Sequence, residues 1–319
     1  MARRMPEQLG HYNLLERVGA GGLGTAFRAR DTVLGRTVLV KNAAERVGPD
    51  PLVRKRFLKD ARAAATVSHP NVATLFEVGD RPDQLFLVFE FVPGKTLDQL
   101  QAGRPLDVRR SVDLGVQLAE ALGAAHACGV LHLDVRPANI KVSLGGHAKL
   151  LDTGLSAWTT RGRAERTAGS VDDRGAGDRE DPYRSPEQRR GEPPDHRSDL
   201  FSLGVILFEM LTGRVPADGA SGGPPTPPRP TAVSTAVPPE LDSIVERAMA
   251  DRVEDRYQSA VSFAAELRSV GAMFDVRSGG REPPSLVTAT EARSGRSSRW
   301  LIPFLALLAL AGATWLWLR

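Results

Sequence analysis

Two short motifs separated by a fixed interval constrain this chain more than any other feature. Residues 132–139 read His-Leu-Asp-Val-Arg-Pro-Ala-Asn, and Asp152-Thr-Gly begins thirteen residues after that Asn, beyond two short apolar runs. Asp134 is suited to orient a hydroxyl group, while Asn139 and Asp152 offer the oxygen ligands that a hard divalent metal ion prefers. The spacing therefore indicates phosphoryl transfer from Mg-ATP.

A glycine-rich loop and a lysine lie upstream of these motifs. The loop reads Gly19-Ala-Gly-Gly-Leu-Gly24, and Lys41 closes the apolar run Val38-Leu-Val. Each is weak alone, because such a loop is usually an ordinary hairpin turn and a single lysine usually lies at the surface. In this order the motifs resemble the signature set of the protein kinases, specifically the bacterial eukaryotic-like (Hanks-type) serine/threonine kinases.

This resemblance implies an α+β, two-lobed protein kinase fold, with a small β-rich lobe and a larger helical lobe. We expect a tail over 1–8 and a kinase domain over 9–270, divided into a small lobe (9–91) and a large lobe (92–270). The apolar periodicity agrees, since it predicts strands first and helices afterwards. The predicted strands lie within 11–41, 75–78 and 85–91, and the predicted helices span 51–67, 108–128, 200–211 and 241–270. Asp199 is the expected N-cap of the third helix, and 213–239 is an expected loop.

The resemblance also implies which residues carry the reaction. Asp134 accepts the proton of the substrate hydroxyl, Lys41 holds the α- and β-phosphates, and Arg136 stands where the family has a catalytic lysine. The expected ligands of Mg²⁺, with Mn²⁺ as an alternative ion, are Asn139 and Asp152. The whole nucleotide-binding set is Gly19, Ala20, Gly21, Gly22, Gly24, Lys41, Glu90, Val92, Asn139 and Asp152. ATP and Mg²⁺ are thus the expected cofactors, and proteins with serine or threonine acceptors the expected substrates.

Other polar residues of these motifs are expected to be structural. By the same resemblance, Glu187 pairs with Arg256, and Asp199 hydrogen-bonds the catalytic loop from a central helix. A nucleophilic pair of Cys128 with His132 is the alternative, but the family places this histidine in the core.

Several positions depart from the family pattern. Asp60 stands where the family has the helix glutamate that pairs with the strand lysine, so the reach to Lys41 is one methylene shorter. Leu133 replaces an arginine, Thr153 replaces the Phe that packs under the helix, and Glu180 lies before the substrate platform. These changes leave two functions open: an active serine/threonine kinase, or a nucleotide-binding pseudokinase that acts as a scaffold. A proline-rich adaptor working through 222–230 is a third.

The composition narrows the range of partners. The net charge is only +4 and the basic residues are scattered, which argues against nucleic acid as a partner. The single cysteine, Cys128, excludes an internal disulfide and fits a reducing compartment.

The C-terminal end predicts attachment to a lipid bilayer. Trp300 to Leu318 is nineteen residues without a charge, about 28 Å as a helix, which matches the hydrocarbon thickness of a membrane. A buried core helix is the alternative. Residues 271–299 form the expected juxtamembrane linker, whose Arg293, Arg296 and Arg299 outnumber the single Arg319 beyond the span. This bias predicts a single-pass protein of the cell membrane, with a cytoplasmic kinase domain and no extracellular domain.

Overall fold

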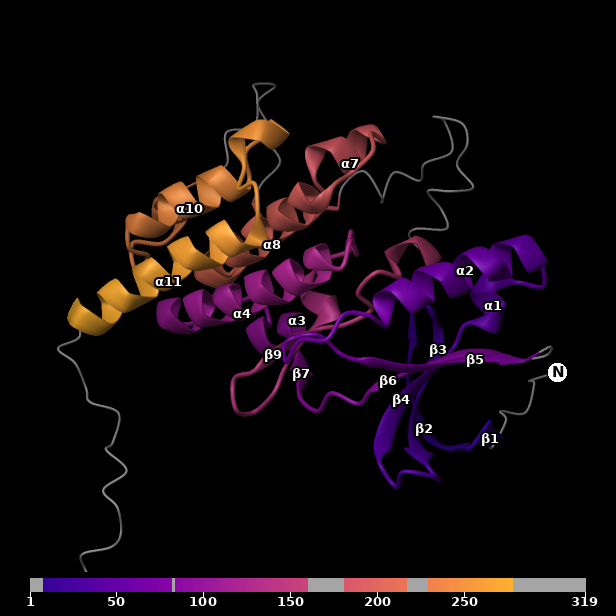
Figure 1. The fold of residues 1–319 in the computed structure, drawn as a ribbon. Coiled ribbons are helices and arrows are strands. Elements are labelled where there is room, and N and C mark those ends of the chain that lie inside the picture. The colour runs from indigo at the N-terminus through magenta and orange to yellow at the C-terminus, as the bar shows by residue number, and fades with distance from the viewer. Residues whose placement is uncertain (1–7, 82–83, 160–180, 217–228, 278–319) are drawn as a thin grey trace, which may run out of the picture. The chain divides into compact units, whose positions relative to one another are not determined.

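An antiparallel sheet of six strands makes up most of the small lobe (Figure 1). The computed structural model describes residues 8–81, 84–159, 181–216 and 229–277. Neighbouring strands follow the order β1-β2-β3-β4-β6-β5. They are β1 (Gln8–Leu9), β2 (Tyr12–Gly21), β3 (Gly24–Asp31), β4 (Thr37–Asn42), β5 (Leu75–Arg81) and β6 (Gln84–Glu90). The predicted strands within 11–41, 75–78 and 85–91 are therefore confirmed.

The glycine loop is the tight turn between β2 and β3, where Gly21 pairs with Gly24. The next strand, β4, lies in the middle of the sheet and carries Lys41 opposite Leu87 of β6. Because β4 has a neighbour on each side, the backbone that positions Lys41 is held by two ladders of hydrogen bonds.

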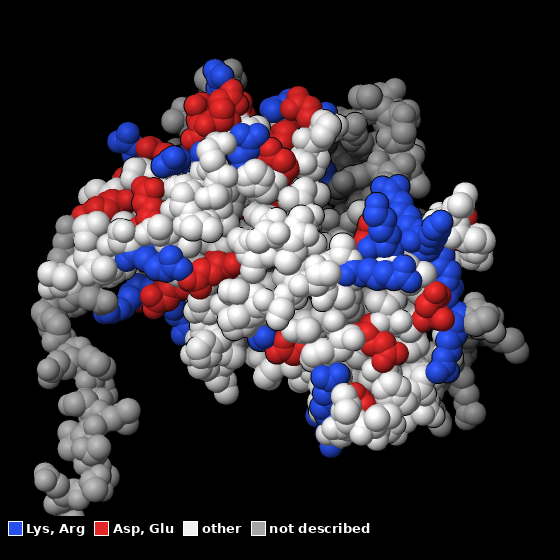
Figure 2. Space-filling model, viewed as in Figure 1, with Lys and Arg blue, Asp and Glu red and all other residues white. Residues whose placement is uncertain are grey.

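Helix α2 (Pro51–Ala64) packs on the sheet, after the single turn α1 (Ala44–Val47). Asp50 is the N-cap of this helix, since its carboxylate accepts from the Leu52 N–H at 2.8 Å, and Pro51 occupies the first turn. Its inward face buries Phe57, Ala61 and Ala64. Figure 2 shows Lys and Arg side chains gathered on the outward face, which exposes Lys55, Arg56, Lys59 and Arg62.

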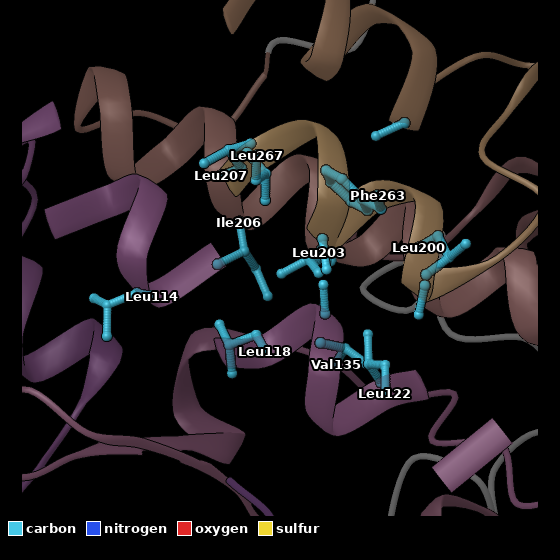
Figure 3. Packing of buried hydrophobic residues seen from close by; sticks show 14 of the residues in the cluster. Leu114, Leu118, Leu122, Val135, Leu200, Leu203, Ile206, Leu207, Phe263 and Leu267 are labelled. Carbon is cyan, nitrogen blue, oxygen red and sulfur yellow. The ribbon is translucent and has the colours of Figure 1, made fainter. Parts of the chain in front are cut away.

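The large lobe is built around α8 (His196–Thr212), which is buried along almost its whole length. Leucines of α4 (Val108–Ala127) pack against it, and Phe263 and Leu267 of α11 (Ala260–Arg277) cover it from another side (Figure 3). The remaining helices are α3 (Leu97–Gln101), α7 (Pro186–Arg190), α9 (Pro230–Val233) and α10 (Glu240–Ala248). A small sheet, β7 (Lys95–Thr96), β8 (Ile140–Val142) and β9 (Ala148–Leu150), carries the loops that follow the catalytic motif.

Four boundary predictions were wrong. Helix α8 starts at His196 and is capped by Asp195, whose carboxylate accepts from the Arg197 N–H, so Asp199 lies inside the first turn. The predicted loop 213–239 contains α9. The predicted helix 241–270 is two α-helices, since between Met249 and Ser259 the chain forms only the 3₁₀ turn Val253–Asp255 and brings Arg256 to a buried partner. Helix α11 also runs on to Arg277, into the predicted linker.

The predicted membrane span, 300–318, lies outside the described residues. Within the described ranges, no helix combines the length and apolar character that crossing a bilayer requires.

Candidate functional site

The catalytic loop is anchored from below by Asp199 of α8. This fully buried carboxylate accepts from the backbone N–H of His132 at 2.9 Å and from that of Leu133 at 2.6 Å, while the His126 ring lies 2.8 Å away. Leu133 has φ +59°, a left-handed conformation that costs about 1–2 kcal/mol in a non-glycine residue. The two hydrogen bonds hold that strained turn, which confirms the predicted structural role of Asp199.

His132 belongs to the core. It is 1% exposed, and its Nε2 lies 2.9 Å from the carbonyl oxygen of Leu151. The free thiol of Cys128 is exposed and lies 3.8 Å from the Thr66 carbonyl oxygen. The residues therefore have separate surroundings, and the nucleophilic pair is not formed.

Asp134 and Asn139 form the centre of the site. The amide nitrogen of Asn139 donates to the backbone oxygen of Asp134 at 2.9 Å and to its carboxylate at 3.0 Å. This arrangement leaves the Asn139 amide oxygen as the atom for a metal ion. Burial raises the pKa of Asp134 and the Asp152 carboxylate adds to the rise, although His132, Arg136 and the Asn139 hydrogen bond oppose it.

Arg136 follows Asp134 by two residues and contributes a cation to the same site. Its Nε is buried and finds no hydrogen-bond acceptor in the described part of the chain. A buried donor without an acceptor is costly, so this group is suited to receive an anionic oxygen from a ligand.

Lys41 pairs with Asp152 across the two lobes. The ammonium lies 2.6 and 2.7 Å from the two carboxylate oxygens, and Lys41 is 5% exposed. The ring of Phe89 stands 5.5 Å from the same nitrogen. The structure thus joins the strand lysine directly to a predicted metal ligand.

The expected pairing of Lys41 with Asp60 is absent from this structure. Asp60 instead accepts from the indole N–H of Trp158 at 2.8 Å. Trp158 follows Asp152-Thr-Gly in a single 3₁₀ turn, Ser156–Trp158, and its indole holds the carboxylate that the family pattern pairs with the lysine. The sequence contained no signal for this contact, because nothing in the motifs marked Trp158.

At two glycines of the loop, Gly22 and Gly24, the surrounding structure leaves no room for a Cβ. Gly24 has φ +116°, and a Cβ there would lie 2.0 Å from the Asn42 carbonyl oxygen. Near Gly19, by contrast, a Cβ would meet nothing within 4 Å, so the backbone there is open to an approaching ligand. A Cβ on Gly22 would lie 2.8 Å from that of Thr159, because the chain after Asp152 packs against the loop. Ala20 and Gly21 end strand β2 within this turn.

Glu90 and Val92, two of the predicted nucleotide-binding residues, lie where the small lobe passes into the large lobe. The Glu90 carboxylate accepts from Lys149 at 2.9 Å, and the Val92 carbonyl oxygen accepts from Lys141 at 3.0 Å. Both lysines come from the small sheet of the large lobe. The motifs did not predict these two lysines, which hold Glu90 and Val92 in place.

The end of the activation segment (152–187) is tied to the late helices, as predicted. Arg256 donates from both terminal nitrogens to the two Glu187 oxygens at 2.8 Å each, with both side chains buried. Burial alone would raise the pKa of Glu187, but the hydrogen bonds from Arg256 and Ser198 lower it to about 2. Gln188 next to it donates to the Leu133 carbonyl oxygen at 3.1 Å, which fastens this segment to the catalytic loop. Glu180 lies outside the described residues.

The residues predicted to hold a metal ion, Asn139 and Asp152, lie together at this site. Asn139 and Asp152 are held close in space because the Leu151 N–H donates to the Asn139 carbonyl oxygen at 2.9 Å. The described residues contain no group of three or more His, Cys, Asp or Glu side chains arranged for a metal. Two oxygen ligands suit Mg²⁺, which keeps several waters and binds substrate phosphates.

Comparison with known proteins places these features in context. The family profile described as the protein kinase domain matches residues 12–225. The chain is 35% identical over 270 residues to the serine/threonine-protein kinase PknB of Mycolicibacterium smegmatis, covering 80% of this chain and 42% of that protein. It is 30% identical over 271 residues to PrkC of Bacillus subtilis, covering 82% of this chain and 40% of that protein. The chain thus spans about two fifths of the length of these relatives.

Solved structures agree on the fold. The crystal structure of the Mycobacterium tuberculosis PknI kinase domain superposes with a TM-score of 0.65 at 24% identity, covering 82% of this chain and 97% of that one. A likeness at this identity supports the two-lobed architecture.

Proposed function

Because the chain belongs to the protein kinase family, we propose that it transfers the γ-phosphate of ATP to serine or threonine hydroxyls of proteins. The observation that carries the proposal is the meeting of Asp134, Asn139, Asp152 and Lys41 at one site, with Arg136 beside them. The bacterial relatives that the chain resembles are named as serine/threonine-protein kinases.

In this proposal each residue has a distinct task. Asp134 holds the acceptor hydroxyl and takes its proton, and the Asn139 amide keeps that carboxylate in place. Asn139 and Asp152 hold Mg²⁺, which neutralises phosphate charge, with Mn²⁺ as an alternative. Lys41 and the buried Nε of Arg136 are donors for phosphate oxygens. Glu90 and Val92 offer backbone groups to the adenine.

We also infer that residues 300–318 anchor the protein in the cell membrane and leave the kinase domain in the cytoplasm. The nineteen uncharged residues and the arginines before them support this. The full chain should stay with membranes through high salt and alkaline washing, and protease added outside sealed cells should leave the kinase domain intact. Release by alkaline washing, or digestion from outside, would contradict the inference.

A second candidate is a nucleotide-binding scaffold with little catalysis. The direct pair of Lys41 with Asp152 favours it, because in this arrangement the lysine occupies a carboxylate that catalysis requires for metal. Leu133 and Thr153 point the same way, since each replaces a residue of the family pattern.

One assay separates the two candidates. The purified full chain is incubated with radiolabelled ATP, Mg²⁺ or Mn²⁺, and a generic protein acceptor, beside Asp134→Asn. A kinase gives transfer that this variant abolishes, while Mg-ATP binding stays within about threefold because Asp134 positions the acceptor and not the nucleotide. Nucleotide binding without transfer in the wild type supports the scaffold. Equal transfer by both proteins marks a contaminant.

A further inference from the structure

Trp158 belongs to the core of the small lobe although it lies in the activation segment. It is 3% exposed, and the cluster that contains it and the fully buried Leu155 also contains Phe57 of α2 and residues of the sheet. Its ring meets that of Phe57 edge to face, with centroids 5.1 Å apart. One tryptophan thus joins a segment of the large lobe to the helix of the small lobe.

The Trp158 indole also decides where the Asp60 carboxylate goes. Its N–H donates to Asp60 at 2.8 Å, and among the described residues no cation lies within ion-pair distance of Asp60. Lys41, the cation expected to pair with Asp60, lies on Asp152 instead. The two contacts are therefore linked: while the indole binds Asp60, the lysine binds Asp152.

The glycine loop is tied to the same place. Leu23, at the tip of the loop, is fully buried in the cluster with Trp158. Gly22 comes so close to Thr159 that even a Cβ would not fit between them. A loop that must lie over phosphates is here packed onto Thr159, next to Trp158.

Thr153 provides no aromatic side chain at the position where the family pattern has one. In the position where the sequence pattern expects a Phe under α2, Thr153 is buried and its hydroxyl finds no partner in the described residues. Gly154 lies against α2, since a Cβ there would be 3.3 Å from that of Ala64. The aromatic contact with α2 is made from Trp158, five residues after Thr153, and it brings a hydrogen-bond donor that Phe lacks.

We propose that Trp158 is a positioning residue that keeps the site in a resting arrangement, with Asp60 on the indole, Lys41 on Asp152 and the glycine loop drawn in. The proposal rests on the proposed function, because it concerns how that site takes up Mg-ATP. Release of Trp158 frees Asp60 for Lys41, and Lys41 then leaves Asp152 open for metal. The two arrangements exchange one carboxylate partner for another, so a nucleotide that binds the second arrangement better shifts the population.

Two substitutions in the full chain test this exchange. Trp158→Phe keeps an aromatic ring on Phe57 and removes the N–H, while Asp60→Asn keeps an oxygen for the indole and removes the charge that Lys41 needs. We expect Trp158→Phe to bind Mg-AMPPNP at least about fivefold tighter than wild type, about 1 kcal/mol, and to lower the KM for ATP. Asp60→Asn should bind no tighter, and Trp158→Phe should give no gain in that background.

Controls separate positioning from packing. Trp300→Phe, Trp315→Phe and Trp317→Phe make the same chemical change more than 200 residues from Asp60 in the sequence, and nucleotide affinity should not change. Equal affinity of wild type and Trp158→Phe, both with cooperative melting, overturns the proposal. A gain that persists in the Asp60→Asn background also overturns it.

Fluorescence gives a readout that does not depend on how Trp158→Phe folds. The chain has four tryptophans, so the triple control variant leaves Trp158 as the only indole. Saturating Mg-AMPPNP should expose the Trp158 indole and increase the quenching of its fluorescence by acrylamide. Unchanged quenching in protein that binds the nucleotide contradicts the exchange. Absence of phosphate transfer would remove the proposed kinase function alone, because both tests read nucleotide binding.

Discussion

The two sides of the candidate site are held in different ways. On the large-lobe side each acceptor has several donors: Asp199 takes two backbone N–H groups besides the His126 ring, and Glu187 takes Arg256 and Ser198. On the small-lobe side, the described contacts give Asp60 one indole and give Lys41 one carboxylate. The first side is overdetermined, whereas the second depends on single contacts that can exchange.

This difference separates stability from regulation. A carboxylate that holds backbone donors cannot change partners without unfolding the turn it supports, because buried N–H groups would lose their acceptors. A side chain that holds another side chain can rotate to a new partner at small cost. The large-lobe side therefore supplies fixed geometry, and the small-lobe side supplies the adjustable part.

The largest effect should come from breaking the buried pair of Glu187 with Arg256. Arg256→Met leaves Glu187 buried without its cation and should lower the free energy of unfolding by about 3–5 kcal/mol in urea denaturation. The folded-state pKa of Glu187 is about 2 against an ordinary value of 4.5, so the stability from this pair is present above pH 4.5 and is lost as the pH falls towards 2. The variant should lack that part of the acid sensitivity.

The control for that pair is an exposed one. Arg252 and Glu254 form an ion pair with side chains 71% and 58% exposed, so Arg252→Gln should leave the urea midpoint unchanged. Similar losses in both variants would mean that burial does not distinguish these pairs.

A smaller effect is expected from Asp199→Asn. The amide has one oxygen in place of two, so one of the two backbone N–H groups loses its acceptor. The turn at Leu133, which has a positive φ, should then relax. We expect a loss of about 1.5–3 kcal/mol of unfolding free energy and a fall in turnover. Hydrogen exchange at His132 and Leu133 should rise before global unfolding; unchanged exchange there would refute the role of Asp199.

The pH dependence of catalysis tests Asp134. Burial raises its pKa above the ordinary 3.8, and the carboxylate must be ionised to accept a proton. The value of kcat/KM should therefore fall about tenfold per pH unit as the pH drops below this raised pKa. The sign for stability is opposite, because protonation favours the folded state and stability falls as the pH rises through the same range. An acid limb centred at or below 3.8 would contradict the assignment.

Lengthening Asp60 probes the adjustable side. Asp60→Glu adds the methylene that the pairing with Lys41 lacks, so steady-state turnover should rise by less than about fivefold, roughly 1 kcal/mol of barrier. Asp80→Glu, at an exposed carboxylate paired with Arg54, is the matched control and should leave turnover unchanged. Lower activity in Asp60→Glu would show that the small lobe has adapted to the shorter side chain.

The smallest effect is expected from phosphate on the activation segment. Leu133 offers no charge to a phosphate beside the catalytic loop, and Thr159 is 5% exposed with its hydroxyl bonded to the Ser156 carbonyl oxygen. Phosphatase treatment, or alanine at Thr159, Thr160, Thr167 and Ser170, should change turnover by less than about threefold, roughly 0.7 kcal/mol. A tenfold loss would show that another basic residue, first of all Arg136, has replaced the missing arginine.

Much of the large-lobe side was predictable from the sequence. The pairing of Glu187 with Arg256 and the support from Asp199 join residues far apart in the chain, and it was the resemblance to the family that implied them. The helix start at Asp195 was missed because the first turn of α8 is polar, and the break before Arg256 was missed because no glycine or proline marks it in 249–259. Lys141 and Lys149 were missed for another reason, since a lysine on a short strand looks the same whether it meets solvent or a carbonyl oxygen.

By itself the sequence determined the order of strands and helices and the set of polar groups available to the site, because periodicity and turn chemistry act over a few residues. On the small-lobe side, only the tertiary structure decided which of those groups are partners. Two carboxylates, Asp60 and Asp152, were candidate partners of Lys41. The ammonium binds Asp152, while Asp60 accepts from the indole of Trp158, a residue that no motif marks. Such a pairing depends on the distances between segments far apart in the chain. When alternative contacts have similar strength, the sequence does not predict which of them forms.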